Sequence, residues 1–463
     1  MSRVLLLTTE PLPLPGWPTT GAGLRAWGLA QALRARGHDL KLLMPDDALR
    51  GYAPPPSAAP PTREFPPWVE TFRRGALADD PRLTDGDVIV LQHWGLADEL
   101  GEPGLPLAID LAGPHLLERR LWGSTTPELD VAEKLGALRK ADFVTAGGRR
   151  QQAYFLPYLR LAGWEIDDLE TSIPVVPFSL RPESGPAPPR PARFLYGGYL
   201  LPWQDPTTTL EIVLEELGSA GRGELVFVGG PHPRHDVSGG GLEPLIERLR
   251  RHPNVRLLEP MSYDAYVALL REGGVALDLM RRNAERQLAF TTRTVQYLAC
   301  GLPVVHDDYS ELGELIARHG GGWTFSPDDE GGVRRLIRGL LQGEIDPTRA
   351  GRAALDLVAE RLDWEKTIAP LDAFCRQPRE RPGKIGTALQ FEAAPRRLAE
   401  LEGRLARAEA QLATLRGKRW VRWGVSFSSL RGWAAWLLAP AAALIGLILI
   451  PVFLLNDLIG RRR

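Results

Sequence analysis

Short apolar runs alternate with amphipathic segments along most of the chain. The first run, Val4–Thr8, precedes a loop and then the segment Leu24–Arg36. Four apolar residues of that segment recur at the spacing of one helix face: Ala26, Leu29, Ala30 and Leu33. Such alternation of strand-like runs and helical patterns predicts an α/β fold with parallel sheets.

The strand-like runs fall into two groups. The first group is Val4–Thr8, Leu40–Leu43, Asp87–Leu91, Leu107–Asp110, Phe143–Thr145 and Ile173–Val176, and the second is Phe194–Tyr196, Leu225–Val228, Val255–Leu258, Val275–Leu279, Pro303–Val305 and Trp323–Phe325. A proline-rich linker, residues 181–193, lies between them. We therefore expect two Rossmann-like, doubly wound domains, residues 1–180 and 194–377. Ligands of such sheets bind beyond the carboxyl ends of the strands, which places the expected site between the domains.

The C-terminal region has a different pattern. After a second linker, residues 378–395, leucines recur among charges over residues 396–417, which predicts a coiled coil or an amphipathic helix. A coiled coil would allow a homo-oligomer; a solvated spacer helix is the alternative. A basic, tryptophan-rich strip begins at residue 418 and leads into Trp433–Leu455, which holds no charged residue and is long enough to span a bilayer. A helix lying in one leaflet and a buried helix are the other interpretations.

Composition excludes several classes of protein. The net charge of −1 argues against a general nucleic-acid binder. The two cysteines, Cys300 and Cys375, provide no disulfide framework or metal site and fit a reducing compartment. The N-terminus has no signal-peptide pattern, so we expect the large domains on the cytoplasmic side of the cytoplasmic membrane. We expect no metal either, since the loop His232–Asp236 has only a superficial ligand pattern.

One segment suggests a phosphate site. In FTTRTVQYLACGLPVV, Phe290–Val305, the N-cap types Thr291 and Thr292 precede a short helix that Gly301 ends. The helix start would present N–H groups, a hydroxyl and the cation of Arg293 together, an arrangement that binds phosphate. An ordinary capped helix is the plainer interpretation.

Several motifs together resemble glycosyltransferases of the GT-B fold, family-4 type. The turn ACGLPVV and the stretch SELGELIARHGGGW are similar to that family's C-terminal domain, and TTGAGLRAWGLAQALRARGHDLKLL is similar to its first loop, helix and second strand. The resemblance extends over about residues 1–376. It implies a nucleotide-diphosphate sugar as donor, with no metal or other cofactor, and a glycan or lipid-linked acceptor.

The sequence departs from the family pattern at the donor site. Gln296 stands where the family has its second glutamate, and Glu285 lies eleven residues before it, not eight. Tyr199 and Gln204 occupy the places of the family's arginine and lysine. We therefore expect Arg286, Arg293 and Thr292 to hold the diphosphate.

The other predicted substrate-binding residues follow from the same resemblance. Gly198 would let the backbone approach the phosphates. Gln296 would bind a ribose hydroxyl and Glu285 the sugar, and Thr294 belongs to the same helix start. Gly21 and Gly23 resemble the family loop that closes on donor and acceptor.

Two residues that end strands are candidates for acceptor-side catalysis. Asp110 and His93 lie at the carboxyl ends of their predicted strands, where a carboxylate or an imidazole can orient or deprotonate a hydroxyl. Asp110 is the preferred candidate and His115 a weaker one. The prediction is a membrane-associated glycosyltransferase that retains anomeric configuration. Another GT-B nucleotide-sugar enzyme, such as an epimerase, and a non-catalytic membrane-tethered scaffold are the alternatives.

Overall fold

The computed structural model describes residues 1–49, 65–231, 242–382 and 384. The described residues belong to one compact unit, Met1–Glu392, which contains both sheets. The predicted coiled coil and the predicted membrane segment lie outside the described residues. Within the described ranges no helix has the length and apolar character that crossing a bilayer requires.

The first sheet is parallel throughout and has the strand order β3-β2-β1-β4-β5-β6. Its strands are β1 (Arg3–Leu7), β2 (Asp39–Pro45), β3 (Val69–Phe72), β4 (Val88–Gln92), β5 (Leu107–Leu111) and β6 (Phe143–Ala146). β4 and β5 are buried over their whole length, because helices cover both faces of a parallel sheet. Their residues are accordingly apolar almost without interruption.

The second sheet repeats this topology. Its order, β12-β11-β10-β7-β8-β9, is again that of a doubly wound fold, with all strands parallel. The strands are β7 (Arg193–Leu200), β8 (Glu224–Pro231), β9 (Val255–Leu258), β10 (Val275–Asp278), β11 (Val304–Asp307) and β12 (Gly322–Phe325). The order reverses between β1 and β4 in one sheet and between β7 and β10 in the other.

Helices pack on both sheets. Those of the first domain are α1 (Gly21–Ala35), α2 (His115–Leu121), α3 (Pro127–Lys140), α4 (Arg149–Leu161) and α5 (Leu169–Ser172). Those that follow are α6 (Thr207–Ala220), α7 (Glu243–Arg251), α8 (Tyr263–Arg271), α9 (Ala284–Leu288), α10 (Thr292–Ala299), α11 (Glu311–His319), α12 (Glu330–Gln342), α13 (Thr348–Leu357), α14 (Trp364–Thr367) and α15 (Ala369–Arg376). Two apolar clusters line each sheet, one on either face.

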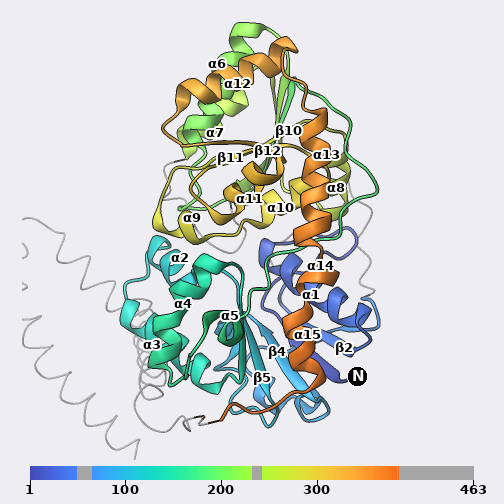
Figure 1. Cartoon of the computed structure of the whole chain (residues 1–463), viewed down its shortest axis with the longest axis vertical. Helices are drawn as coiled ribbons and strands as arrows, with labels where there is room; N and C mark the ends of the chain where they lie inside the picture. Colours follow the sequence, from blue (N-terminus) through green and yellow to red (C-terminus); the bar gives the residue numbers. More distant parts are fainter. Residues whose placement is uncertain (50–64, 232–241, 383, 385–463) are drawn as a thin grey trace, which may run out of the picture. The chain divides into compact units, whose positions relative to one another are not determined.

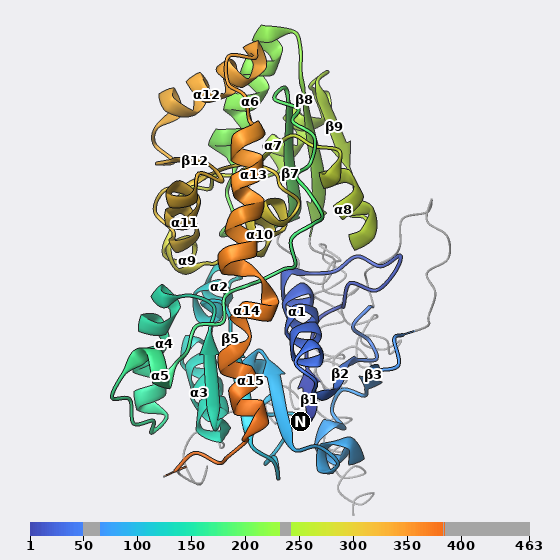
Figure 2. The same cartoon turned by 45° about the vertical axis from the view of Figure 1, so that its right-hand side comes forward.

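The last helix packs on the first domain. α15 follows α14 in the chain, and its Leu371 and Phe374 belong to the core of the first sheet (Figures 1 and 2). Phe374 stacks on Phe143 at 4.6 Å between ring centroids. This helix was predicted as part of the second domain, because helical periodicity shows that a face is buried but not which sheet covers it.

Most predicted elements are present, with two differences. β3 has only four residues, VETF, with one apolar residue at each end, and the pattern did not reveal it. Ile173–Val176 is not a strand, since Val175 makes a single bridge to Ala146. The strongest sequence signals, the long buried strands, are those that the structure confirms.

Candidate functional site

A cavity of about 550 Å³ lies where the carboxyl ends of the two sheets meet. Glu10 follows β1 and His93 follows β4, and both line it. On the other side Gly198 belongs to β7 and Asp278 ends β10. These are the points at which each strand order reverses, the places where doubly wound folds bind ligands.

Asp278 organises the floor of the cavity on the second domain. Its carboxylate accepts hydrogen bonds from Thr291 Oγ1 at 3.0 Å, from the Thr294 hydroxyl and from Arg293 Nη1 at 3.2 Å. The side chain of Thr291 therefore does not cap α10, although the residue occupies the N-cap position. Thr294 is fully buried and its hydroxyl points to Asp278, so it supports the site from behind.

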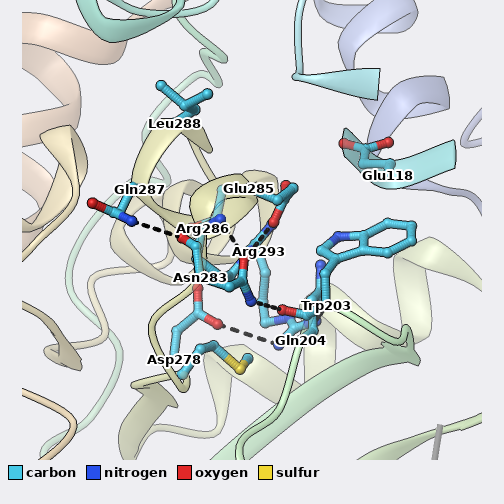
Figure 3. Close-up of polar contacts among 12 residues, drawn as sticks. Glu118, Trp203, Gln204, Asp278, Asn283, Glu285, Arg286, Gln287, Leu288 and Arg293 are labelled. Atoms are coloured by element: carbon cyan, nitrogen blue, oxygen red, sulfur yellow. Dashed lines mark hydrogen bonds and ion pairs between the residues drawn. The ribbon is translucent and has the colours of Figure 1, made fainter. Parts of the chain in front are cut away.

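Arg293 is held from three sides. Its Nη1 binds Asp278, and its Nη2 donates to Gln204 Oε1 at 2.6 Å (Figure 3). Its guanidinium carbon lies 4.8 Å from the centre of the Tyr196 ring. Gly198 has φ of +135°, and a β-carbon there would come within 2.7 Å of Arg293 Nη2. The glycine thus makes room for this arginine, whereas its predicted role was to make room for phosphates.

Glu285 and Arg286 form a buried ion pair at the start of α9. Arg286 donates through Nε at 2.5 Å and through Nη2 at 2.8 Å to the two carboxylate oxygens of Glu285, and both residues line the cavity (Figure 3). Asn283 caps this short helix by accepting from the Arg286 N–H. Burial raises the pKa of Glu285, and the neighbouring Arg286 opposes that rise. The predicted cation Arg286 is therefore present at the cavity but shared with Glu285.

Of the remaining predicted residues, some line the cavity and one, Gly23, packs outside it. Gly21 and Thr292 both line the cavity, where a β-carbon on Gly21 would come within 2.5 Å of Thr292 Oγ1. Gln296 lines it too, and its amide oxygen accepts a 2.6 Å hydrogen bond from Tyr263. Gly23 is not among the lining residues. It packs against the main chain, since a β-carbon there would lie 2.0 Å from the carbonyl oxygen of Pro11.

Asp110 has a structural environment that does not favour a catalytic base. It is 1% exposed, and both its carboxylate oxygens accept hydrogen bonds from Arg25 at 2.6 Å. Thr145 donates a third at 2.7 Å. Asp110 does not line the cavity, whereas Arg25 does. The carboxylate therefore fixes Arg25, and an acceptor hydroxyl has no access to it.

His93 faces the cavity as a hydrogen-bond donor. Its Nδ1 accepts the Gly95 N–H at 2.9 Å, which leaves the proton of the neutral ring on Nε2. Burial lowers the pKa of His93 well below its ordinary value, and the charges of His115 and Arg119 lower it further. Its φ of +101° is a strained conformation for a residue with a β-carbon. This geometry suits donation to a substrate oxygen and not proton abstraction.

His115 and Glu118 form a charged pair opposite Glu285 and Arg286. The imidazole binds Glu118 Oε2 through Nδ1 and the carbonyl oxygen of Ala112 through Nε2, each at 2.8 Å. Burial alone would lower the pKa of His115, but the Glu118 carboxylate outweighs it and the pKa is raised. Both acceptors require a proton, so the ring is an imidazolium. Glu118 lines the cavity, and the sequence did not single it out.

The other residues of the site that the sequence did not reveal have partners that lie 13 or more positions away in the chain. Asp278 ends an apolar run in the segment VALDLM, the only local signal of its role. Trp122 and Trp203 approach each other at the cavity with ring centroids 5.1 Å apart, 81 positions apart in the chain (122 against 203). Across the described ranges no group of three side chains has metal-ligating chemistry and spacing, and His232–Asp236 lies outside those ranges.

Comparison with known proteins relates the second domain to a described family. Residues 211–373 match a family model described as glycosyl transferase-like. The second domain is thus similar to glycosyl transferase-like domains, which agrees with the prediction of a glycosyltransferase. No curated protein matches the chain.

Solved structures match over most of the chain. Sucrose-phosphate synthase from Thermosynechococcus elongatus is 14% identical, with a TM-score of 0.57, over 81% of this chain and 99% of that one. A UDP-forming α,α-trehalose-phosphate synthase from Burkholderia vietnamiensis is 15% identical, with a TM-score of 0.55, over 81% and 97%. A trehalose-6-phosphate synthase is 14% identical, with a TM-score of 0.59, over 81% and 100%. These similarities confirm the predicted GT-B fold.

Proposed function

We propose that the protein transfers a sugar, with retention of anomeric configuration, from a nucleotide-diphosphate sugar to a glycan or lipid-linked acceptor. The observation that carries this proposal is the position of Arg293. It is fixed by Asp278 and Gln204 at the reversal point of the second sheet and faces a cavity large enough for a nucleotide sugar. The glycosyl transferase-like match of the same domain supports it.

The donor diphosphate would bind between Arg293, Arg286 and the start of α10. Cleavage of the anomeric C–O bond develops negative charge on the leaving phosphate, and cations held in place before the reaction stabilise that charge without reorganisation. The hydroxyl of Thr292 lies at the same helix start. Gln296, with its amide oxygen oriented by Tyr263, would bind the ribose, and Glu285 would bind the sugar.

On the acceptor side, His93 and Glu118 would orient the hydroxyl group that attacks. The two candidate bases from the sequence offer no accessible basic atom, since Asp110 is paired and Nδ1 of His93 is occupied. The proton of the acceptor hydroxyl would then pass to an oxygen of the leaving phosphate. That oxygen lies on the face from which the donor phosphate departs, so the acceptor enters from the same face and the configuration is retained.

The predicted membrane tail would hold the enzyme at the cytoplasmic face of the membrane, near a lipid-linked acceptor, and a coiled coil would allow self-association. We propose no metal, because Arg286 and Arg293 supply positive charge for the diphosphate. Nucleic acid is not expected as the acceptor, given the net charge of −1.

A nucleotide-sugar screen tests the proposal directly. One solved neighbour, an α-glucosyltransferase with a TM-score of 0.55, is described in complex with UDP and a 13-mer DNA, which makes UDP and UDP-sugars the first compounds to examine. A bound ligand raises the thermal midpoint of the protein. The compound that does so should then be hydrolysed or transferred, with the anomeric product followed by NMR and a 13-mer DNA as the negative acceptor control.

The possible results separate the alternatives. Binding followed by release of free nucleotide supports a transferase, and an inverted product contradicts the retaining mechanism. Binding with neither hydrolysis nor transfer favours the scaffold, whereas isomerisation of the nucleotide sugar itself would indicate an epimerase. No binding of any nucleotide sugar contradicts the proposal.

A further inference from the structure

The first three residues of α4, Arg149, Arg150 and Gln151, all contact the second domain. The main-chain N–H groups of Arg149 and Arg150 donate to the two carboxylate oxygens of Glu311 at 3.1 and 3.2 Å. A carboxylate at this position stabilises the positive end of a helix dipole, and here it comes from α11 of the other domain. Arg150 also donates to the Gln287 carbonyl at 3.2 Å and pairs with Glu314.

Gln151, the third of these residues, connects two loops of the site and the end of α9. Its Oε1 accepts the N–H of Gly113 at 3.1 Å, in the loop before His115, and the N–H of Gly147 at 3.1 Å, in the loop before α4. Its Nε2 donates to the carbonyl of Leu288 at 3.0 Å. Leu288 is the last residue of α9, the helix that carries Glu285 and Arg286 (Figure 3).

The three bonds differ in what they join. Both bonds to Oε1 stay within the first domain, and the bond from Nε2 alone crosses to the second. Gln151 is 2% exposed, so neither end of its amide can exchange its partner for bulk water at low cost. α9 also packs against α2 and α4, as Figures 1 and 2 show.

We infer that Gln151 is a positioning residue. It fixes the distance between the ion pair Glu285–Arg286, on the donor side of the cavity, and the pair His115–Glu118, on the acceptor side. The same amide holds the loop before His115 and the end of α9. When the domains separate, the Nε2 bond breaks, and the donor-side pair moves away from the acceptor-side pair as one body with α9. The inference concerns the reaction put forward under Proposed function and rests on it.

Gln151→Glu isolates the crossing bond. The side chain keeps its shape, and a carboxylate oxygen still accepts from Gly113 and Gly147. The second oxygen faces the Leu288 carbonyl at about 3 Å, the distance of a hydrogen bond. When ionised it repels that carbonyl, and when protonated it donates to it. The variant should therefore open at high pH and close again at low pH, which the loss of a merely structural amide would not produce.

Gln152→Glu is the matched control. Gln152 is the next residue of α4, and its Nε2 donates to the carbonyl of Ile173 at 2.7 Å, within the first domain. The same chemical change there removes a donor of the same helix without affecting any bond between the domains.

The distance between two spin labels, one on each domain, measures whether the domains are closed or open, and no substrate is needed. One label is attached through Leu161→Cys, which is 64% exposed in the native chain, and the other through the exposed Gln342→Cys of α12. Both native cysteines are buried. In the full-length chain, Gln151→Glu should show longer distances than the parent at pH 8 and the parent distribution at pH 5, whereas Gln152→Glu should match the parent at both. Equal distributions for Gln151→Glu and the parent at both pH values, or the same shift in Gln152→Glu, would overturn the inference.

Transfer kinetics add a second readout. Gln151→Glu should lower kcat at pH 8 about 10-fold or more relative to the parent and recover at pH 5, with UDP affinity unchanged, because Arg293 and its partners lie within the second domain. A fall in UDP affinity in place of kcat would contradict a positioning role. If UDP does not bind even the parent, the proposed function is in doubt, while the label distances still decide whether Gln151 holds the domains together.

Discussion

The buried amine of Lys134 allows us to predict how much an unpaired charge near the cavity lowers the stability of the fold. The residue lies on α3, is fully buried, and its Nζ has no hydrogen-bond partner within the described residues. Three ring faces surround the amine, those of Tyr158 at 4.2 Å, Phe155 at 4.5 Å and Tyr154 at 4.9 Å. Burial lowers the pKa of Lys134 from 10.5 to about 7. We expect Lys134→Met, which keeps the volume and removes the amine, to stabilise the fold.

The magnitude follows from the pKa shift. One pKa unit corresponds to about 1.4 kcal/mol, so at pH 7 the shift of Lys134 lowers the free energy of unfolding by roughly 4 kcal/mol. The ring faces recover part of this cost, since a desolvated cation–π contact contributes about 0.5–2 kcal/mol. We therefore expect the Met variant to unfold with a free energy roughly 2–4 kcal/mol higher at pH 7.

The pH dependence has a definite sign. Between the folded pKa of about 7 and the unfolded pKa of 10.5, the unfolded chain binds more protons at Lys134, so stability rises with pH in this window. The cost is complete below pH 7 and absent above pH 10.5. The Met variant lacks this dependence, and the gap between the two proteins should narrow by about 2 kcal/mol from pH 7 to pH 9.

Urea unfolding followed by circular dichroism at pH 7, 8 and 9 measures both quantities. Lys140→Met serves as a control on the same helix, because Lys140 Nζ donates to the Ala97 carbonyl at 3.1 Å and its loss should destabilise the protein. The reasoning is refuted if Lys134→Met is no more stable than the parent at pH 7, or if the gap stays constant as the pH rises.

Three further predictions concern the site and the tail. Arg293→Ala should weaken nucleotide-sugar binding by roughly 1.5–3 kcal/mol in titration calorimetry, the range for a hydrogen bond to a charged group. Arg282→Ala, a change outside the cavity, should leave the affinity unaltered. Equal affinities of the Arg293→Ala variant and the parent would exclude Arg293 from the donor site. Glu118→Gln should lower kcat/KM for the acceptor about 10- to 150-fold at unchanged nucleotide affinity, and an unaltered acceptor kcat/KM would remove Glu118 from the acceptor side. Truncation after Lys384, which keeps the contacts of Arg381 with the first domain, should release the protein from the membrane fraction with donor binding intact and slow transfer to membrane-borne acceptors. A truncated chain that remains in the membrane fraction, or that no longer binds the donor, would contradict this division.

The sequence by itself determined the fold and the general place of the site. Apolar runs such as the one within Asp87–Leu91 are typical of strands buried between layers of helices, so their number and spacing predicted two parallel sheets. The turn ACGLPVV and the helix before it identified the segment that contains Arg293 and Gln296. Both lie at the cavity, because the carboxyl end of a parallel strand and the helix that follows it are joined locally.

The tertiary structure alone decided which candidate side chains are available for chemistry. Asp110 is equivalent to other strand-ending acids in the sequence, but Arg25, 85 residues away, occupies both its oxygens. The tautomer of His93 depends on one N–H of the following turn, and the role of Gln151 on a carbonyl 137 residues distant. Whether a hydrogen bond forms between two segments far apart in the chain depends on differences of a few tenths of an ångström in the distance between their atoms. Periodicity and motif spacing describe only neighbours along the chain, and they leave those contacts undetermined.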